Sequence, residues 1–352
     1  MMTKMNSRSF LATSVLAATL STQASASEML SVVGSWSSLP LHKQFEQPFW
    51  NQTIPAKTNG EFEVAMTTHD QMGIGGGDVF RMLGDGVFDI GMTVADYAVA
   101  DAPALEGLDV PLLATTAAEA KTLVEAARPM IESIYQDTFN AKVLAIVPYP
   151  PQVVFCNAPV SNLDDLAGLK IRASGRMTAK FLEALDAQSV NIAFGEVPGA
   201  LQRGVIDCAV TGAGSGYSAG WWEVTTHLMT LPLGGWDPVV TAINLDKWND
   251  LSSADQELIA TSVAEEFEAP AWAAAQGALE EDIACLTGNG VCSRGDKRNL
   301  VLVEPAAQDV AKAKDILSSK VLPEWADRAG EEWTNRWNMS VGKAAGIQIS
   351  AQ

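Results

Sequence analysis

Residues 168–175 read "GLKIRASG": a short apolar run, typical of a strand, ends on Arg172 and is followed at once by small residues. Ligands of open parallel sheets bind beyond the carboxyl ends of the strands, which is where Arg172 is expected to lie. Ser174 is well placed to cap a helix that begins near Arg176, and a helix N-terminus favours an anion. Because a guanidinium binds a carboxylate bidentately, this stretch predicts a carboxylate clamp. The alternative is an arginine that pairs with an acid inside the protein.

Short β-branched apolar runs alternate with longer helical patterns on both sides of this stretch. The pattern predicts strands over 29–36, 61–68, 87–94, 141–150, 152–160, 168–173, 189–194, 205–210 and 237–248. It predicts helices over 41–58, interrupted near Pro48, and over 75–86, 117–138, 176–187, 197–204 and 252–286. This rhythm predicts an α/β fold with mainly parallel sheets that helices cover on both faces.

The length of the chain predicts two domains, because about 325 residues after an N-terminal leader exceed what one core usually serves. We expect domain I over 27–150 plus about 237–252, domain II over 151–236, and C-terminal helices over 253–352 that pack across both lobes. A single helix over 252–286 is about 50 Å long and runs along both domains. Two such lobes with crossing strands describe a bilobed binding protein whose cleft closes by hinge bending.

The first 26 residues read as a signal peptide rather than as part of the fold. Lys4 and Arg8 precede the apolar core "FLATSVLAATL" (10–20), and "ASA" (24–26) is a small-residue cleavage site. The core is short for a membrane span, although an N-terminal membrane anchor is the alternative. We therefore expect an exported, periplasmic protein with no stable membrane insertion.

The charge balance argues against nucleic acid and anionic membrane surfaces as partners. The sequence has 23 basic and 42 acidic side chains, and the leader removes two bases and no acid, which leaves a net charge of −21. Both excluded partner classes require basic patches. The balance suits a very soluble globular protein.

The four cysteines invite disulfides in an exported chain. Cys285 and Cys292 flank "LTGNGV", a turn-rich segment that can close a short loop. Cys156 and Cys208 are then left over in apolar, strand-like runs, where they either pair with each other or stay unpaired as small buried hydrophobes.

The sequence offers no metal site by residue spacing. It has no Cys-x-x-Cys motif, and none of its three histidines stands at ligand spacing (His42, His69 and His227). We expect neither a metal nor a cofactor.

Three segments resemble the periplasmic solute-binding proteins of TRAP transporters, the DctP family: "GDVFRMLGDGVFDIGMT" (77–93), "LDDLAGLKIRASG" (163–175) and "FGEVPGALQRGVIDCAVTG" (194–212). The family's pattern has a "DLkGlKiR" segment and then "EvytALqxGvvDg", and the resemblance covers essentially the whole mature chain. It implies a protein that binds a small organic acid and delivers it to a permease of one small and one large membrane subunit. The arginine of "KiR" takes the substrate carboxylate in the family, and Arg172 occupies that position.

The chain departs from this pattern after "vDg", where many members continue with "qenp". Here "IDCAVTGAGSGYSAGWWEVTTH" (206–227) follows, so Thr211 and Gly212 are expected to offer a hydroxyl and backbone N–H groups to a ligand. Trp221 and Trp222 add an aromatic wall in one interpretation, and at least one of them is core in the other. The carboxylate and tryptophan pair of the metal-assisted keto-acid members has no evident counterpart, which again predicts no metal.

Other candidates for the cleft follow from strand ends and from the two expected crossings between lobes. They are Trp36, Ser37, Ser38, Thr93, Tyr97, Gln152, Phe194 and Trp236, beside Arg172, Ser174, Thr211 and Gly212. Each has a structural alternative: the two tryptophans as core, the serine pair as a helix cap, the tyrosine as surface.

Two other functions fit parts of the sequence: a serine hydrolase and a sensor-type binding protein. "GYSAG" (216–220) satisfies the nucleophile elbow of serine hydrolases, but the predicted strand ends eight residues before Ser218, and His227 is the only histidine downstream. A sensor-type binding protein, which passes its ligand signal to a membrane receptor, is indistinguishable from a transport protein by sequence. We therefore expect a binding protein rather than an enzyme.

Overall fold

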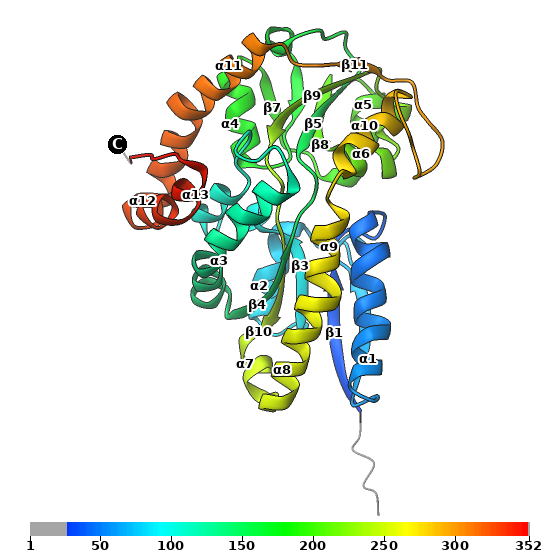
Figure 1. Ribbon diagram of the computed structural model, residues 1–352, viewed down its shortest axis with the longest axis vertical. Helices are drawn as coiled ribbons and strands as arrows, with labels where there is room; N and C mark the ends of the chain where they lie inside the picture. Colours follow the sequence, from blue (N-terminus) through cyan, green and yellow to red (C-terminus); the bar gives the residue numbers. More distant parts are fainter. Residues whose placement is uncertain (1–26, 351–352) are drawn as a thin grey trace, which may run out of the picture.

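The chain builds two β-sheets, one in each of two lobes, in the computed structural model, which describes residues 27–350 (Figure 1). The predicted signal peptide lies outside the described residues. The first sheet has the order β2-β1-β3-β10-β4, with β1 Glu28–Gly34, β2 Phe62–Thr68, β3 Ile90–Val94, β4 Ala141–Val147 and β10 Val239–Asn244. The second has the order β11-β9-β5-β8-β6-β7, with β5 Gln152–Cys156, β6 Lys170–Arg172, β7 Gln188–Val190, β8 Cys208–Gly212, β9 His227–Gly234 and β11 Val301–Val303.

Each sheet is mainly parallel, as predicted, and takes one antiparallel strand at the place where the chain crosses between lobes. β10 runs antiparallel between β3 and β4. β5 runs antiparallel between β8 and β9 in the second sheet. The two crossings are therefore the short segments before β5 and before β10, and both end inside a sheet rather than at its edge.

The central strands are buried along their whole length and are mostly apolar, because helices cover both faces of each sheet. All residues of β3, β5 and β8 are buried. The edge strand β2 instead alternates between buried and exposed positions over part of its length. Continuous apolar runs are expected of strands buried on both faces, and alternation is expected where one face meets water.

The helices lie close to the predicted ranges. They are α1 Ile54–Lys57, α2 Val79–Gly84, α3 Ala117–Phe139, α4 Arg176–Ala184, α5 Val197–Gln202, α6 Ala213–Ser218, α7 Leu245–Asp250, α8 Ser253–Ser262, α9 Ala269–Ala274, α10 Ala278–Thr287, α11 Ala307–Ile316, α12 Leu322–Trp337 and α13 Lys343–Ala345. The longest, α3, begins at a capping box of Thr116 and Glu119 and ends at Asn140 in the left-handed region.

Two helix predictions were wrong in detail. The helix over 41–58 is not interrupted at Pro48, because π-helical turns (η1 His42–Glu46 and η2 Phe49–Thr53) carry it past the missing N–H into α1. The segment 252–286 is not one helix. It runs from α8 through a π-helical segment to the end of α9, stops, and begins again as α10 after Gly277, whose φ is +71°. Strands β9 and β11 and helix α6 were not predicted. The strand predicted over 237–248 ends at Asn244, and helix α7 follows it.

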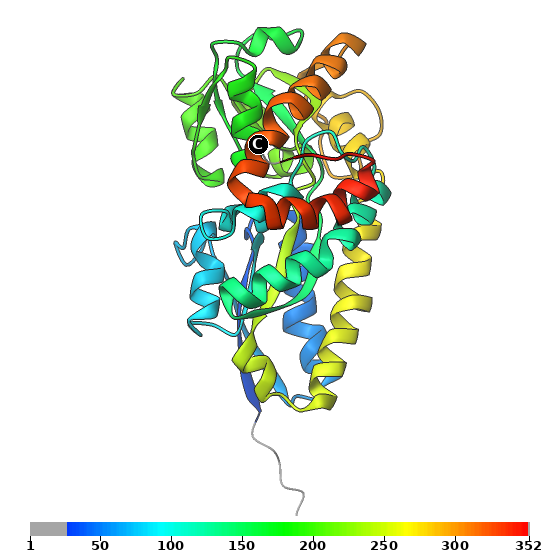
Figure 2. The same cartoon turned by 90° about the vertical axis from the view of Figure 1, so that its left-hand side faces the viewer.

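The C-terminal helices pack against elements of both lobes, and Figure 2 shows them in orange to red across the junction. The π-helical segment Leu317–Val321, between α11 and α12, contacts α4, and α12 contacts the 3-10 turn η5 (Pro103–Leu108). Trp325 and Trp337 each donate an indole N–H to a backbone carbonyl in or beside η5. Among the described residues, the helices are all too short or too polar to cross a membrane.

Both possible disulfides are present. Cys285 and Cys292 pair as predicted, and Cys156 pairs with Cys208, which settles the alternative left open by the sequence. Cys156 and Cys208 face each other in the antiparallel register of β5 and β8.

The two bridges should differ in their contribution to stability because they close loops of different length. The sequence separation is 52 for Cys156–Cys208 and 7 for Cys285–Cys292. Chain entropy then predicts that alanine replacement of the long-range pair costs about 4 kcal/mol of unfolding free energy, against about 2.5 kcal/mol for the short-range pair. Urea titration of the two double-alanine variants measures both losses. A larger loss from the short loop would contradict this account.

Candidate ligand-binding site

A small chamber lies between the two lobes, where the carboxyl ends of β6 and β8 face the crossings. Its lining comes from both lobes: Trp36, Leu39, Tyr97, Tyr149, Gln152, Arg172, Ser174, Phe194, Thr211, Gly212, Ser215 and Asp237. The cavity itself is about 20 Å³. It shares several lining residues with a wide cleft of about 1360 Å³ between the lobes. A small solute can therefore reach Arg172 from solvent through this cleft.

Arg172 is fixed by the backbone around it. Its Nε donates to the carbonyl of Ile192 at 3.1 Å, and its Nη1 donates to the carbonyl of Val210 at 2.7 Å. The side chain is only 2% exposed. Among the described residues, no carboxylate oxygen lies within 4.0 Å of its nitrogens. These bonds orient the guanidinium plane, and the absence of a direct ion pair argues against the internal ion-pair alternative.

Aromatic rings from both lobes surround the guanidinium. The ring of Trp36 makes edge contacts with Tyr97, Tyr149 and Phe194, at centroid distances of 5.6, 6.0 and 6.1 Å. The hydroxyl of Tyr97 lies 3.5 Å from Arg172 Nη2. Burial raises the pKa of Tyr97 to about 12, although the nearby Arg172 charge opposes the shift. Tyr97 is therefore a neutral hydroxyl at any ordinary pH.

Three carboxyl groups gather at the same junction. The oxygens of Asp96, Asp109 and Asp237 lie within 4.8 Å of one another. Asp109 accepts from Gln152 Nε2 at 3.0 Å and from the backbone N–H of Asp237 at 2.7 Å. One oxygen of Asp96 and one of Asp237 are buried and have no donor among the described residues except each other, since a proton on one of these acids forms a hydrogen bond between them.

Burial is the main cause of the shifted pKa values of these acids. It raises the pKa of Asp96 and of Asp109 well above the usual range, and the charge of Asp237 raises both further. Burial raises the pKa of Asp237 to about 7, against the attraction of Arg172. Carboxylate oxygens are also the ligands of hard cations, so this trio is where the described chain could hold one. The expectation of no metal stays a prediction.

The lobes come into close contact at Gly175, the N-cap of α4. A Cβ at this position would lie 1.7 Å from Asp96 Oδ2, so only glycine allows the first-lobe carboxylate to approach so near. The N-terminal end of α4 faces this carboxylate and favours its negative charge. Ser174 does not cap the helix as predicted, because its hydroxyl bonds to Thr178 Oγ1 instead.

The structure brings eight of the predicted residues into the chamber: Trp36, Tyr97, Gln152, Arg172, Ser174, Phe194, Thr211 and Gly212. Ser38 lines the outer cleft, and Ser37 bonds through its N–H and hydroxyl to Asp70 on that cleft. Thr93 is fully buried and lines neither the cleft nor the chamber.

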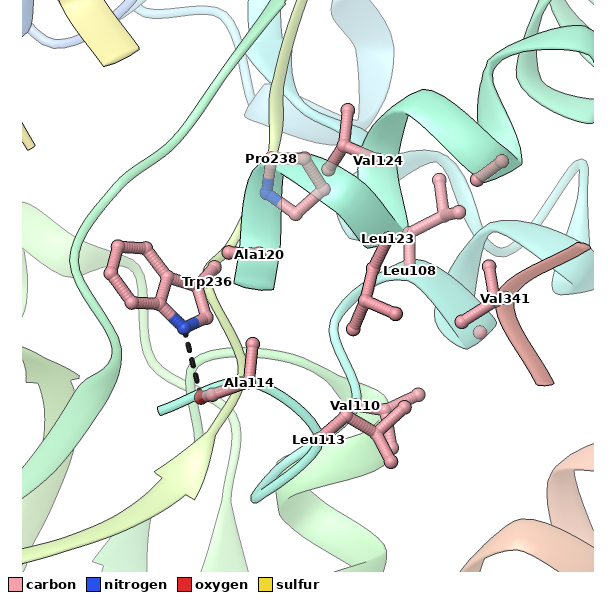
Figure 3. Close-up of a pocket in the computed structure, with 12 residues that line it drawn as sticks. Leu108, Val110, Leu113, Ala114, Ala120, Leu123, Val124, Trp236, Pro238 and Val341 are labelled. Carbon is pink, nitrogen blue, oxygen red and sulfur yellow. Dashed lines mark hydrogen bonds between the residues drawn. The ribbon is translucent and has the colours of Figure 1, made fainter. Parts of the chain in front are cut away.

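Trp236 lies outside the chamber. It lines a separate apolar pocket of about 30 Å³ with Pro238 and residues of α3, and its indole N–H donates to the carbonyl of Ala114 at 3.0 Å (Figure 3). Asp237 adopts the left-handed region (φ +42°), and the crossing places Trp236 in the core and Asp237 at the chamber.

Other residues of the site escaped prediction. Tyr149 and Asp237 lie in the crossing motifs "YPP" and "GGWDP", where Gln152 and Trp236 were the predicted site residues instead. Asp96 follows directly on β3, so the strand-end rule could have identified it. Ser218 ends α6 instead of standing at a strand-to-helix elbow, and the ring of His227 bonds to Thr226. This geometry does not support the hydrolase alternative.

The carboxyl trio should make the unliganded protein less stable as the pH rises. A carboxyl group with a raised folded-state pKa binds more protons in the folded than in the unfolded chain, so the unfolding free energy falls between about pH 4 and pH 7. Asp237→Asn removes one such group. Relative to the parent protein it should gain up to about 1.4 kcal/mol per pH unit in that window. Melting curves of both proteins between about pH 5 and pH 8 check this, and a constant difference would count against it.

Comparison with known proteins agrees with this architecture. Residues 35–291 match the family described as bacterial extracellular solute-binding protein, family 7 (DctP). The ectoine-binding periplasmic protein TeaA of Halomonas elongata is 29% identical over 136 residues, which are 38% of this chain and only 39% of that protein.

Solved structures share the whole fold. DctP7, an extracytoplasmic solute receptor of Bordetella pertussis that binds pyroglutamic acid, has a TM-score of 0.79 and 20% identity over 91% of this chain and 100% of its own. A TRAP periplasmic solute-binding protein of Shewanella oneidensis with bound succinate has a TM-score of 0.77 and 16% identity over 91% and 99%. At these identities the structures establish the fold. The family match covers well over half of the chain, and the chain therefore belongs to the bacterial extracellular solute-binding protein family 7.

Proposed function

We propose that this protein captures a small organic acid in the cleft, closes on it by hinge bending and delivers it to a TRAP-type permease of one small and one large membrane subunit. The observation that carries the proposal is Arg172: a buried guanidinium, oriented by two backbone carbonyls, without a carboxylate partner of its own among the described residues. Arg172 lines both the chamber and the wide cleft, so a carboxylate can approach it from the cleft when the lobes open. A charge buried in this way costs free energy until a partner arrives.

The two lobes supply different parts of the binding site. The second lobe contributes Arg172, and the first lobe contributes the aromatic ring of Trp36. Lobe closure brings them around the solute and removes water, which strengthens the charge-assisted hydrogen bonds to the carboxylate. The lobes in this proposal are 27–150 with about 237–252, and 151–236, with the helices of 253–352 across both.

The similar proteins support a small acid as the solute class without naming one acid, and most of their ligands are carboxylates, although one structure holds sn-glycerol-3-phosphate. Their names give pyroglutamate, succinate and L-gulonate as ligands, and ectoine for TeaA. The family description is extracellular, which supports the proposed periplasmic location after removal of residues 1–26. Solute binding involves no turnover, so the solute should be recovered unchanged.

A sensor-type binding protein is the second candidate, because in both functions a membrane protein recognises the closed, ligand-bound form. The two functions differ in the membrane partner. Reconstitution with the small and large permease subunits should give solute uptake that depends on this protein.

Arg172→Ala should abolish carboxylate binding. Breaking a buried charge pair costs about 3–5 kcal/mol, which is more than a hundredfold in affinity. A thermal-shift screen against dicarboxylates, hydroxy acids, keto acids and amino acids should show stabilisation by one class in the parent protein and none in the variant. Arg203→Ala, at an exposed position of the same lobe, is the matched control and should bind normally. If no carboxylate stabilises the parent protein, the proposal fails.

Gly175→Ala should hold the lobes apart. Its Cβ meets Asp96 Oδ2 at 1.7 Å, and the extended backbone of Gly175 (φ −143°) leaves no strain to confuse the result. Gly195→Ala is the control on the same cleft, because nothing lies within 4 Å of the added Cβ. We expect weaker binding and a larger solution radius with ligand for the first variant only, by calorimetry and small-angle scattering. Equal affinity in both variants would show that this contact is not part of closure.

A further inference from the structure

The chamber holds a negative side chain as well as a positive one. Arg172 stands at the end of β6, and Asp237 lies on the crossing between β9 and β10, and both line the same small cavity. No nitrogen of Arg172 lies within 4.0 Å of the Asp237 carboxylate, so the two do not neutralise each other by direct contact. Carboxylate capture uses Arg172 and leaves Asp237 without a role.

The free acceptor atoms lie where a ligand would meet them. Asp237 Oδ1 is buried and accepts from no donor among the described residues other than the carboxyl group of Asp96 when that group is protonated, and the backbone N–H of Asp237 already donates to Asp109. Asp96 is only 5% exposed, its Oδ1 is likewise without a partner, and it lines the adjoining cleft. Buried acceptors without donors are rare and costly in proteins. In the unliganded protein these two carboxyl groups bond to each other through a shared proton, and a cationic donor that arrives with the ligand can take the place of that proton.

The charge balance of the site favours one type of ligand. Three carboxyl groups and one guanidinium share the junction. Burial raises the pKa of all three carboxyl groups, and a dicarboxylate would raise these pKa values further by placing a second negative charge beside them. A solute with one carboxylate and one cationic nitrogen would instead complement both signs. The rings of Trp36 and Tyr97 beside these groups also favour a cation, because an aromatic face attracts positive charge.

We propose that the solute is a zwitterion, an amino or imino acid whose carboxylate binds Arg172 and whose cationic nitrogen donates to Asp237 and Asp96. This inference rests on the proposed function and narrows its substrate class. It excludes dicarboxylates and plain monocarboxylates as the preferred solutes.

Binding of a zwitterion should release a proton. Asp237 has a pKa of about 7 in the unliganded protein, so part of it is protonated at neutral pH. A cationic nitrogen needs the ionised carboxylate, so the affinity should rise between about pH 6 and pH 8. A carboxylate without a cationic nitrogen binds better when the neighbouring acids are protonated, so its affinity should fall as the pH rises. The other titratable groups that face Asp237 are Asp96, Tyr97, Asp109, Tyr149 and Arg172.

Pairs of ligands that differ only in the nitrogen test the inference. The probes are proline against cyclopentanecarboxylate, pipecolate against cyclohexanecarboxylate, the common L-amino acids against their deaminated acids, pyroglutamate as a neutral N–H donor, and succinate. Calorimetry should show at least one zwitterion bound about 10- to 100-fold more tightly than its nitrogen-free partner. Its affinity should rise with pH, and proton release should appear on changing the buffer.

Asp237→Asn is the decisive variant. Asn tolerates the left-handed backbone at this position (φ +42°), so the crossing can keep its shape. The variant should lose the preference for the zwitterion while it still binds carboxylates through Arg172. Asp186→Asn is the matched control, since Asp186 is exposed and also has a positive φ of +62°.

The outcomes separate the two proposals. If nitrogen-free acids or succinate bind as tightly as the zwitterions, or if Asp237→Asn changes nothing, the inference is wrong and carboxylate capture stands. If pyroglutamate binds best with affinity that falls as the pH rises, a neutral N–H donor replaces the cation and the inference is also wrong. If no acid of any kind binds, the proposed function itself fails.

Discussion

A single desolvated positive charge at the junction of the lobes organises the rest of the site. Arg172 can stay ionised there because the carbonyls of Ile192 and Val210 replace part of its hydration. Parallel pairing of β6 with both β7 and β8 places those carbonyls around the end of β6. The position of the charge is therefore a property of the second sheet, and it does not depend on a side chain that can move away.

The sequence predicts what depends on local pattern. Buried strands and amphipathic helices have a recognisable spacing of apolar residues in the sequence. Arg172 was predictable as a site residue because it stands at the end of an apolar run, where a strand ends. Contacts between distant segments leave no such mark. Asp96, Asp109 and Asp237 meet only because two turns and a crossing converge, and neighbouring residues at that crossing point in opposite directions. Trp236 was therefore expected in the cleft and lies in the core, while Asp237 was missed.

The C-terminal helices limit how the lobes can move. Indole donors on α12 hold the C-terminal helices to the carbonyls near η5, and the segment between α11 and α12 touches α4 of the second lobe. The two crossings and this C-terminal contact support the junction from different sides. A hinge restrained in this way is suited to small rotations that open the cleft mouth.

The chain emerges with its N-terminus first from the machinery that makes or translocates it. The position of β10 in the first sheet therefore affects the order in which the strands of the two lobes can pair. β10 lies between β3 and β4, so the first sheet lacks an inner strand until residue 244 has appeared. By then β5 to β9 are all available, and the oxidation of Cys156 with Cys208 can already have joined two of them. Five of the six strands of the second sheet can thus pair first, and its edge strand β11 joins later. The first sheet must wait with β3 unpaired on one side and β4 without a partner strand, which is where newly made molecules are most open to aggregation or to a chaperone.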